Sequence, residues 1–184
     1  MARPTLPFAC LTALCLVACA PSDQADDPGR AAVDESRAAL LALDGVGELA
    51  YPVPTAEVTA RFGVPFPDLP EYPEAEWCEM TWLPLTPGDS ILAMFTQQGL
   101  VRMDVRQGTR RTGRGVGIGS GEDEVRAAYG EGVEVTPHRY TDGSYLTVRE
   151  PSGSRALVFE TDGRVVTMFR VGALPQVAWV EGCS

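Results

Sequence analysis

The chain has 184 residues, of which 45% are hydrophobic and 22% are charged, and its formal net charge is −10 at pH 7. This composition excludes a disordered or low-complexity chain and fits one hydrophobic core or two small ones. The sequence contains no lysine, which excludes a phosphate-loop lysine and a lysine Schiff base. The net acidity argues against broad nucleic-acid binding, because neutralising phosphates requires a basic face.

The N-terminal segment has the organisation of an export signal. Arg3 supplies a positive charge, and residues 6–18 are mostly apolar but too few to span a bilayer. The run Leu-Val-Ala that precedes Cys19 resembles the lipobox of bacterial lipoproteins, in which small residues precede a cysteine that becomes acylated. We therefore predict a signal peptide over residues 1–18 and lipidation of Cys19. The resemblance implies an outer-membrane anchor facing the periplasm, because Ala20 rather than Asp follows the cysteine.

Two cysteines remain without a role once the signal peptide is removed and Cys19 is acylated. They are Cys78 and Cys183. An exported compartment is oxidising, and two leftover cysteines there most simply form a disulfide. The alternative is a pair of buried free thiols.

The segment that follows the anchor, residues 19–44, is expected to form a tether and a short helix. Its first part is acidic and rich in proline, and it carries too few apolar residues to bury. Residues 31–43 then combine leucine and valine with alanine and charged residues, which favours a helix that ends at Gly45.

The rest of the chain contains an internal repeat. Residues 57–63 match residues 124–130 in sequence, and residues 95–101 match residues 159–165. The first pair of segments has apolar residues four apart followed by glycine, which predicts a short helix and its end. The second pair places glycine between two apolar runs, which predicts a hairpin. The repeats are predicted to span residues 45–108 and 109–184.

Alternating apolar residues predict the strands of both repeats. These runs are 77–83, 91–95, 100–105, 145–148, 155–159 and 165–171. Each repeat is therefore expected to be a short helix followed by an antiparallel meander. The predicted fold class is α+β, with two tandem units of this kind and the helices on one face of the sheet or sheets. Whether the two sheets join into one is left open.

The first predicted helix carries a family resemblance. The run Val58-Thr-Ala-Arg-Phe-Gly-Val-Pro65 is similar to a motif of the SmpA/OmlA (BamE-like) outer-membrane lipoproteins, and 125–130 is a weaker copy. The tandem arrangement also resembles the β-lactamase inhibitor protein fold. Pro52-Val53-Pro54 stands where the family has Gly-Met-Thr. The resemblance implies the fold more than a function.

The sequence offers little catalytic or metal-binding chemistry. His138 is the one histidine, and a lone histidine is more often structural than catalytic. Ser120 does not lie in a Gly-x-Ser-x-Gly elbow. After maturation, too few cysteine and histidine residues remain for a structural zinc site. We predict no catalytic residue, no metal and no cofactor.

Two charge clusters and several aromatic residues are candidates for binding. An acidic cluster contains Asp68, Glu71, Glu74, Glu76 and Glu79 but lacks the spacing of a calcium loop. A run of arginines could contact an anion or a partner protein, because guanidinium groups grip carboxylates and phosphates. Both clusters could equally be solvated faces that pair with each other. The candidate binding residues are Arg102, Arg106, Arg110, Arg111, Arg114, Trp82, Tyr140 and Tyr145.

These observations lead to three functional hypotheses. The leading one is a lipid-anchored envelope protein that binds another protein or an envelope polymer without catalysis. The second is a cell-envelope hydrolase that uses His138 and carboxylates. The third, by analogy of fold alone, is an inhibitor of a foreign enzyme.

Overall fold

The computed structural model describes residues 51–62, 77–86 and 89–183. No helix in these ranges is long and apolar enough to cross a membrane. The signal peptide, Cys19 and the tether lie outside them, as does the acidic cluster apart from Glu79. The elements are α2 (Thr55–Phe62), β1 (Cys78–Thr86), β2 (Asp89–Thr96), β3 (Gly99–Val105), α3 (Glu122–Tyr129), η1 (Gly130–Gly132), β4 (Val133–Pro137), β5 (Ser144–Arg149), β6 (Arg155–Thr161), β7 (Val166–Ala173) and η2 (Gln176–Ala178).

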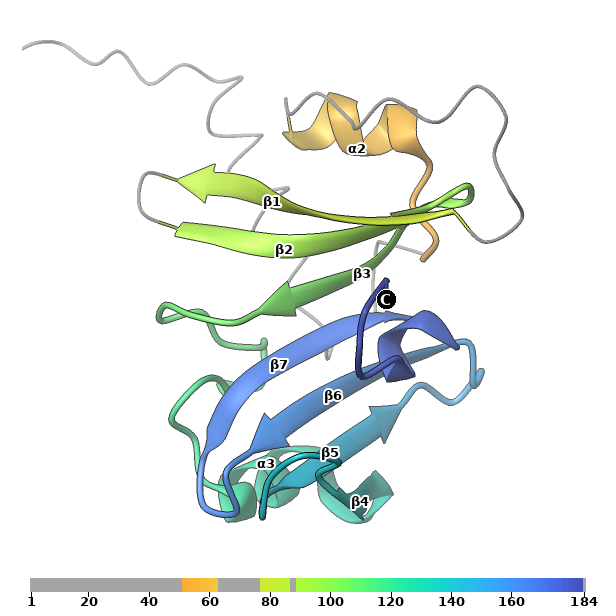
Figure 1. Ribbon diagram of the computed structural model, residues 1–184. Helices are drawn as coiled ribbons and strands as arrows, with labels where there is room; N and C mark the ends of the chain where they lie inside the picture. The colour runs from red at the N-terminus through yellow and green to blue at the C-terminus, as the bar shows by residue number, and fades with distance from the viewer. Residues whose placement is uncertain (1–50, 63–76, 87–88, 184) are drawn as a thin grey trace, which may run out of the picture.

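The seven strands form one antiparallel sheet in the order β1-β2-β3-β7-β6-β5-β4 (Figure 1). The two halves of the chain meet where β3 pairs with β7, in a register that places Arg102 opposite Gly172 and Val105 opposite Phe169. Every residue of β3 is buried. This central strand is therefore covered on both faces of the sheet.

The predicted α+β fold class, with two helix-plus-meander repeats and helices on one face of the sheet, is wrong. Helices do form at 55–62 and 122–129, but each has only eight residues, and Val125 is the one buried residue of α3. A single seven-stranded sheet dominates instead. The pairing of β3 with β7 joins strands that are distant in the sequence, and such a pairing has no local sequence signal. The prediction also omits β4, whose side chains are mostly exposed.

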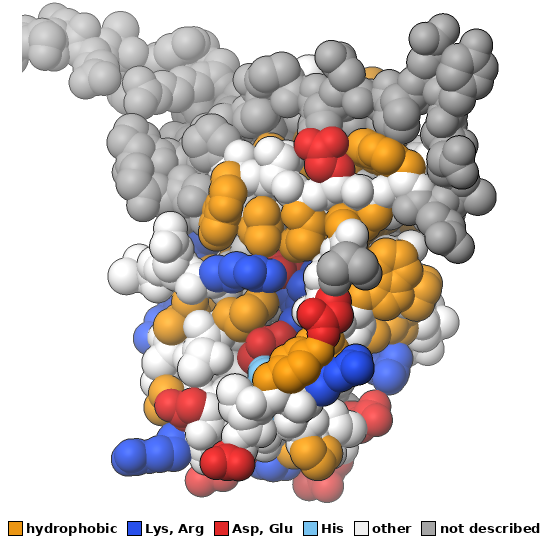
Figure 2. Space-filling view, viewed as in Figure 1, with side chains coloured by type: hydrophobic (Ala, Val, Ile, Leu, Met, Phe, Trp, Pro, Cys, Tyr) orange, Lys and Arg blue, Asp and Glu red, His pale blue; other side chains and the backbone are white. Residues whose placement is uncertain are grey.

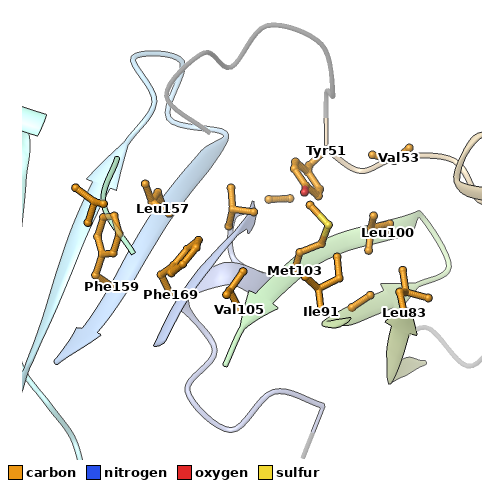
Figure 3. Close-up of a cluster of buried hydrophobic side chains, with 14 of the residues drawn as sticks. Tyr51, Val53, Leu83, Ile91, Leu100, Met103, Val105, Leu157, Phe159 and Phe169 are labelled. Atoms are coloured by element: carbon orange, nitrogen blue, oxygen red, sulfur yellow. The ribbon is translucent and has the colours of Figure 1, made fainter. Parts of the chain in front are cut away.

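The main hydrophobic core lies on one face of this sheet and runs across both halves of the chain (Figure 3). Phe159 of β6 and Phe169 of β7 pack with their ring centroids 5.8 Å apart. Each helix adds one buried valine, Val58 in α2 and Val125 in α3. Because the core is continuous from β1 to β6, the two halves are expected to unfold together.

The opposite face is covered by the C-terminal segment, residues 174–183, which we call the C-terminal tail. It contains η2 and lies across β3, β6 and β7 (Figure 1). A disulfide joins Cys183 to Cys78 of β1, with a Cα–Cα distance of 5.4 Å, and confirms the predicted pairing. Gly182 has a φ of +70° and packs so closely on Met80 that an added Cβ would lie 2.6 Å from the methionine sulfur. The tail is therefore fixed at its end as well as along its length.

The edge strand β4 ends in Pro137, and a proline there protects this edge from pairing with other chains. His138, the next residue, donates its backbone N–H to the carbonyl of Gly143, on the β5 side. Because successive residues of a strand alternate, Pro137 sits where its N–H would point outward. The missing donor removes one site at which another strand could add.

Candidate functional site

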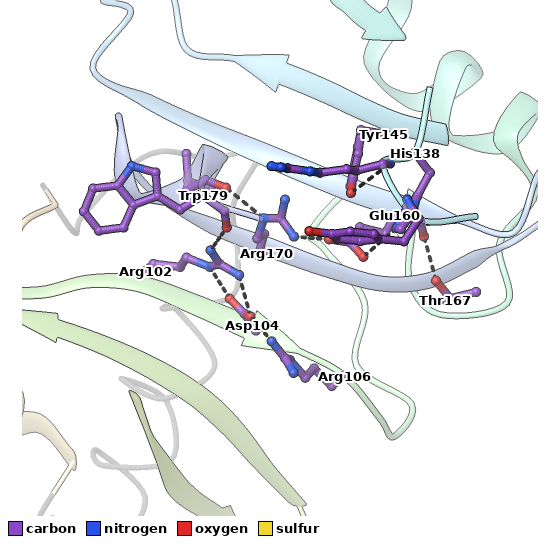
Figure 4. A network of polar contacts seen from close by, with 12 residues as sticks. Arg102, Asp104, Arg106, His138, Tyr145, Glu160, Thr167, Arg170 and Trp179 are labelled. Atoms are coloured by element: carbon purple, nitrogen blue, oxygen red, sulfur yellow. Dashed lines mark hydrogen bonds and ion pairs between the residues drawn. The ribbon is translucent and has the colours of Figure 1, made fainter. Parts of the chain in front are cut away.

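Two buried arginines lie beneath the C-terminal tail. Arg102 of β3 is 0% exposed, and Asp104 follows it by two residues on the same face of the strand. Nε and Nη2 of Arg102 donate to Oδ1 and Oδ2 of Asp104 at 2.6 and 2.8 Å. Nη1 donates to the backbone carbonyl of Trp179 at 2.6 Å (Figure 4). Arg102 therefore fastens the tail to β3 while Asp104 balances its charge.

Arg170 of β7, which is 2% exposed, also binds the C-terminal tail. Its Nε donates to the carbonyl of Val177 at 2.8 Å, and its Nη1 pairs with Oε1 of Glu160. Its guanidinium lies 5.7 Å from the ring centroid of Tyr145. Burial, and then the nearby charge of Arg102, lower the pKa of Arg170 from its ordinary value. Nη2 donates to no residue in the described part of the chain.

His138 is held by three neighbours of this network. Its Nδ1 accepts the backbone N–H of Tyr140 at 3.1 Å, and its Nε2 lies 3.3 Å from Oε2 of Glu160. Its ring stacks on Tyr145 with centroids 4.5 Å apart. Because Nδ1 acts as an acceptor, the proton of the neutral ring is on Nε2 and is donated to Glu160. Both ring nitrogens are thus engaged, and the carboxylate that His138 contacts also binds Arg170 (Figure 4).

A groove of about 330 Å³ opens beside this network, between the tail and the outer strands. Its floor consists of small side chains, Thr147 of β5 with Ala156 and Val158 of β6. Aliphatic residues of the tail, among them Val177, form a wall, and the nearly buried Arg170 also lines the groove. The register places Thr147, Val158 and Arg170 in one row across the sheet. The groove exists because small residues on β5 and β6 stand next to a raised tail.

The outer rim of the groove is polar. Glu134 of β4 and Arg149 of β5 form an exposed ion pair, with Nε of Arg149 3.4 Å from Oε2 of Glu134. Thr136 of β4 lines the same rim. The groove thus joins an aliphatic interior to charged and hydroxyl groups.

The structure brings together only two of the five candidate arginines. Arg102 and Arg106 meet at Asp104, and Nη2 of Arg106 lies 3.2 Å from its Oδ2. Arg106 keeps 43% of its side chain exposed. Arg102, in contrast, is inaccessible to a partner.

The other three candidate arginines lie in the segment between β3 and α3. Arg111 donates to the carbonyl of Gly115 at 2.8 Å. Arg114 donates to the carbonyl of Ala128 in α3 at 2.6 Å. Arg110 is half-buried. Arg111 stabilises its own loop and Arg114 joins this loop to α3, which is an ordinary use of guanidinium donors next to backbone carbonyls.

The three candidate aromatic residues occupy different environments. Trp82 on β1 is 48% exposed and Tyr140 is 60% exposed, whereas Tyr145 is buried in β5. Figure 2 shows hydrophobic side chains in a row over β1 and β2, and the register places Trp82 beside Leu92 there. Charged side chains gather over the lower half of this face. The described ranges contain no group of three or more histidine, cysteine, aspartate or glutamate residues placed to hold a metal ion.

Sequence reasoning missed Arg170, Glu160 and the residues of the groove. A usable signal was present at Arg170, which interrupts the apolar run of β7 between Phe169 and Val171. A charge inside a buried strand requires a partner, so this arginine predicts a buried polar contact. Thr147 carries no comparable signal, because a threonine in a strand is ordinary.

Comparison with known proteins gives little further information. The chain matches no protein-family model, and no curated protein matches it. It is similar to the crystal structure of a DUF4309 family protein (YjgB) from Bacillus subtilis, with 14% sequence identity and a TM-score of 0.45. The match covers 79% of this chain and 96% of that chain. A similarity this low carries no argument about function.

Proposed function

We propose that this chain is a lipid-anchored protein of the bacterial cell envelope that acts as a non-enzymatic binding module. The anchor is Cys19, preceded by a signal peptide over residues 1–18, and the body faces the periplasm. The lipobox-like sequence supports the anchor. The observation that carries the binding role is the groove between the C-terminal tail and β4–β6, which combines an aliphatic wall with a buried arginine. Concave sites of this composition are those that proteins use for ligands.

The surroundings of His138 favour binding over the hydrolase hypothesis. A general base must reach substrate with a free nitrogen. Nδ1 of His138 accepts a backbone N–H and Nε2 contacts Glu160, whose other oxygen pairs with Arg170. His138 also does not line the groove. These groups therefore support the shape of the sheet surface.

The anchor is tested by a Cys19→Ala variant expressed in a Gram-negative host. We expect unprocessed precursor and loss of the lipid-dependent mass of the mature protein. A mature protein that still begins at residue 19 and partitions with membranes as before would refute the anchor.

The binding role is tested by placing a photo-crosslinking amino acid at Thr147, in the groove, and at Thr59, an exposed position on α2. We expect crosslinked envelope species from the first position only. Equal products from both positions, or none from Thr147, would count against a binding groove.

A further inference from the structure

We infer that the groove binds a monoanionic carboxylate carried on a short branched aliphatic group. The inference rests on the proposed function and deepens it by naming the class of ligand. Two sources share this chemistry, namely the C-terminus of a peptide that ends in a small aliphatic residue and a free branched-chain acid.

The first support is a donor of a groove-lining arginine that has no partner among the described residues. Arg170 is 2% exposed and lines the groove, and its Nε and Nη1 are occupied by Val177 and Glu160. Nη2 donates to no described residue, and Figure 4 shows the remaining end of the guanidinium without a contact. Nη2 is not one of the buried polar atoms that lack a partner, so it reaches the solvent of the groove, where an acceptor on a ligand can replace water. A carboxylate is the acceptor that a guanidinium binds most strongly in proteins.

The second support is the balance of charge around the groove. The charged residues that line the groove are Arg149, Arg170 and Glu134, so its lining carries one arginine more than carboxylates. This small positive excess stands out on a chain with a formal net charge of −10. It matches a monoanion. A phosphate dianion would meet repulsion from Glu134 and Glu160 that the single excess charge does not offset.

The third support is the apolar part of the groove. Val177 and Val180 of the tail pack with Val158 and Ala156 of β6 in one apolar cluster, and all four line the groove. The volume of about 330 Å³ is at the lower end for ligand sites. A short branched aliphatic group fills such a space and gains by leaving water. A long acyl chain would not fit.

Hydroxyl groups on the rim and in the floor complete the site. Thr136 and Thr147 line the groove, and their hydroxyls have no partner among the described residues. Arg149 offers its terminal nitrogens on the same side, because only its Nε contacts Glu134. These donors could hold a carboxylate oxygen or the amide carbonyl of a peptide.

The test uses methyl NMR spectra of the full chain in non-ionic detergent, with valine methyl groups labelled. The probes are isovalerate, N-acetyl-L-valine and N-acetyl-L-valinamide at about 10 mM, chosen to exceed a millimolar dissociation constant. We expect the methyl signals of Val158, Val177 and Val180 to shift, and those of Val58 and Val125, on the opposite face, to stay. The two acids should bind about tenfold or more tightly than the amide, because only they form charge-assisted hydrogen bonds.

Variants locate the site. Thr147→Leu fills the floor and should abolish the shifts, while Thr59→Leu on α2 should leave them unchanged. Arg149→Gln should weaken acid binding about 3- to 10-fold, and Arg164→Gln at an exposed turn should not.

The outcomes separate this inference from the proposed function. Equal affinity for acid and amide, or no shift with any probe, overturns the carboxylate class, whereas crosslinks from Thr147 would still support a binding module. Preference for N-acetyl-L-valine over isovalerate identifies a peptide terminus as the source, and the reverse identifies a free acid. Shifts that persist in Thr147→Leu overturn the site itself.

Discussion

Replacing Asp104 by asparagine tests whether the buried ion pair holds the tail-covered face of the sheet. Asp104 is fully buried and accepts two hydrogen bonds from Arg102 and one from Arg106. Asp104→Asn keeps the shape of the side chain but removes its charge. One of the two amide positions then presents a donor to a guanidinium, which can only donate.

The expected loss follows from the contacts that remain. Removing one partner of a buried pair costs about 3–5 kcal/mol, because the other charge is left without compensation. Arg102 keeps its bond to the carbonyl of Trp179, and Arg106 is exposed enough to be hydrated. We therefore expect the lower end of that range, about 3 kcal/mol. Against a typical total of about 5–15 kcal/mol, this is a large share.

The assay is urea unfolding of the full chain at pH 7, followed by tryptophan fluorescence. Asp142→Asn, at an exposed turn position, is the matched control and should change the free energy of unfolding by less than about 0.5 kcal/mol. A loss of less than about 1 kcal/mol for Asp104→Asn would refute the reasoning.

Three further changes test other parts of the fold. Cys183→Ser, which cannot form the disulfide, should lower the free energy of unfolding by about 2–4 kcal/mol and keep one cooperative transition; equal stability without reductant would contradict this. Gly172→Ala places a Cβ 2.2 Å from a backbone carbonyl of β3 and should destabilise by about 2 kcal/mol or more, whereas Gly132→Ala meets open space and serves as its control in the same denaturation assay. The hydrogen bond from Arg155 is the largest cause that lowers the pKa of Glu150, to about 2 from 4.5. Because the folded pKa is the lower one, this pair stabilises the protein above about pH 4.5 and ceases to do so as the pH falls to about 2. Glu150→Gln should therefore be less stable than the parent at pH 7, and the difference should close near pH 2; a difference that is independent of pH would contradict the pairing.

Local signals in the sequence predicted local structure correctly. Asp162 and Gly163 mark the turn between β6 and β7, where the aspartate side chain accepts the backbone N–H groups of Arg164 and Val165. The two eight-residue helices begin and end close to their expected positions. The disulfide followed from counting cysteines in an exported chain. The turn and the helices depend on residues that are neighbours in the sequence. The disulfide depends only on the fact that two cysteines remain to pair.

The assembly of the sheet could not be predicted in this way. Pairing of β3 with β7 is fixed by contacts such as Val105 against Phe169, which are far apart in the sequence. The same limit applies to the candidate site. Arg102 resembled a binding residue because the sequence shows its charge but not its burial, and its partners on the tail lie more than seventy residues away. The repeat pattern therefore predicted individual helices and hairpins, but not the single seven-stranded sheet in which the strands assemble.

The position of the C-terminal tail links stability to the proposed site. Val177 forms part of the groove wall and accepts the Nε–H of Arg170 through its own carbonyl. The same arginine presents the unused Nη2 to the groove, so one residue both fixes the wall and offers the donor. The disulfide fixes the end of the tail beyond the groove. Since opening the disulfide leaves the arginine contacts in place, we expect the tail to loosen first at its end. The wall would then persist, because Val177 lies nearer to the arginine contacts than to Cys183.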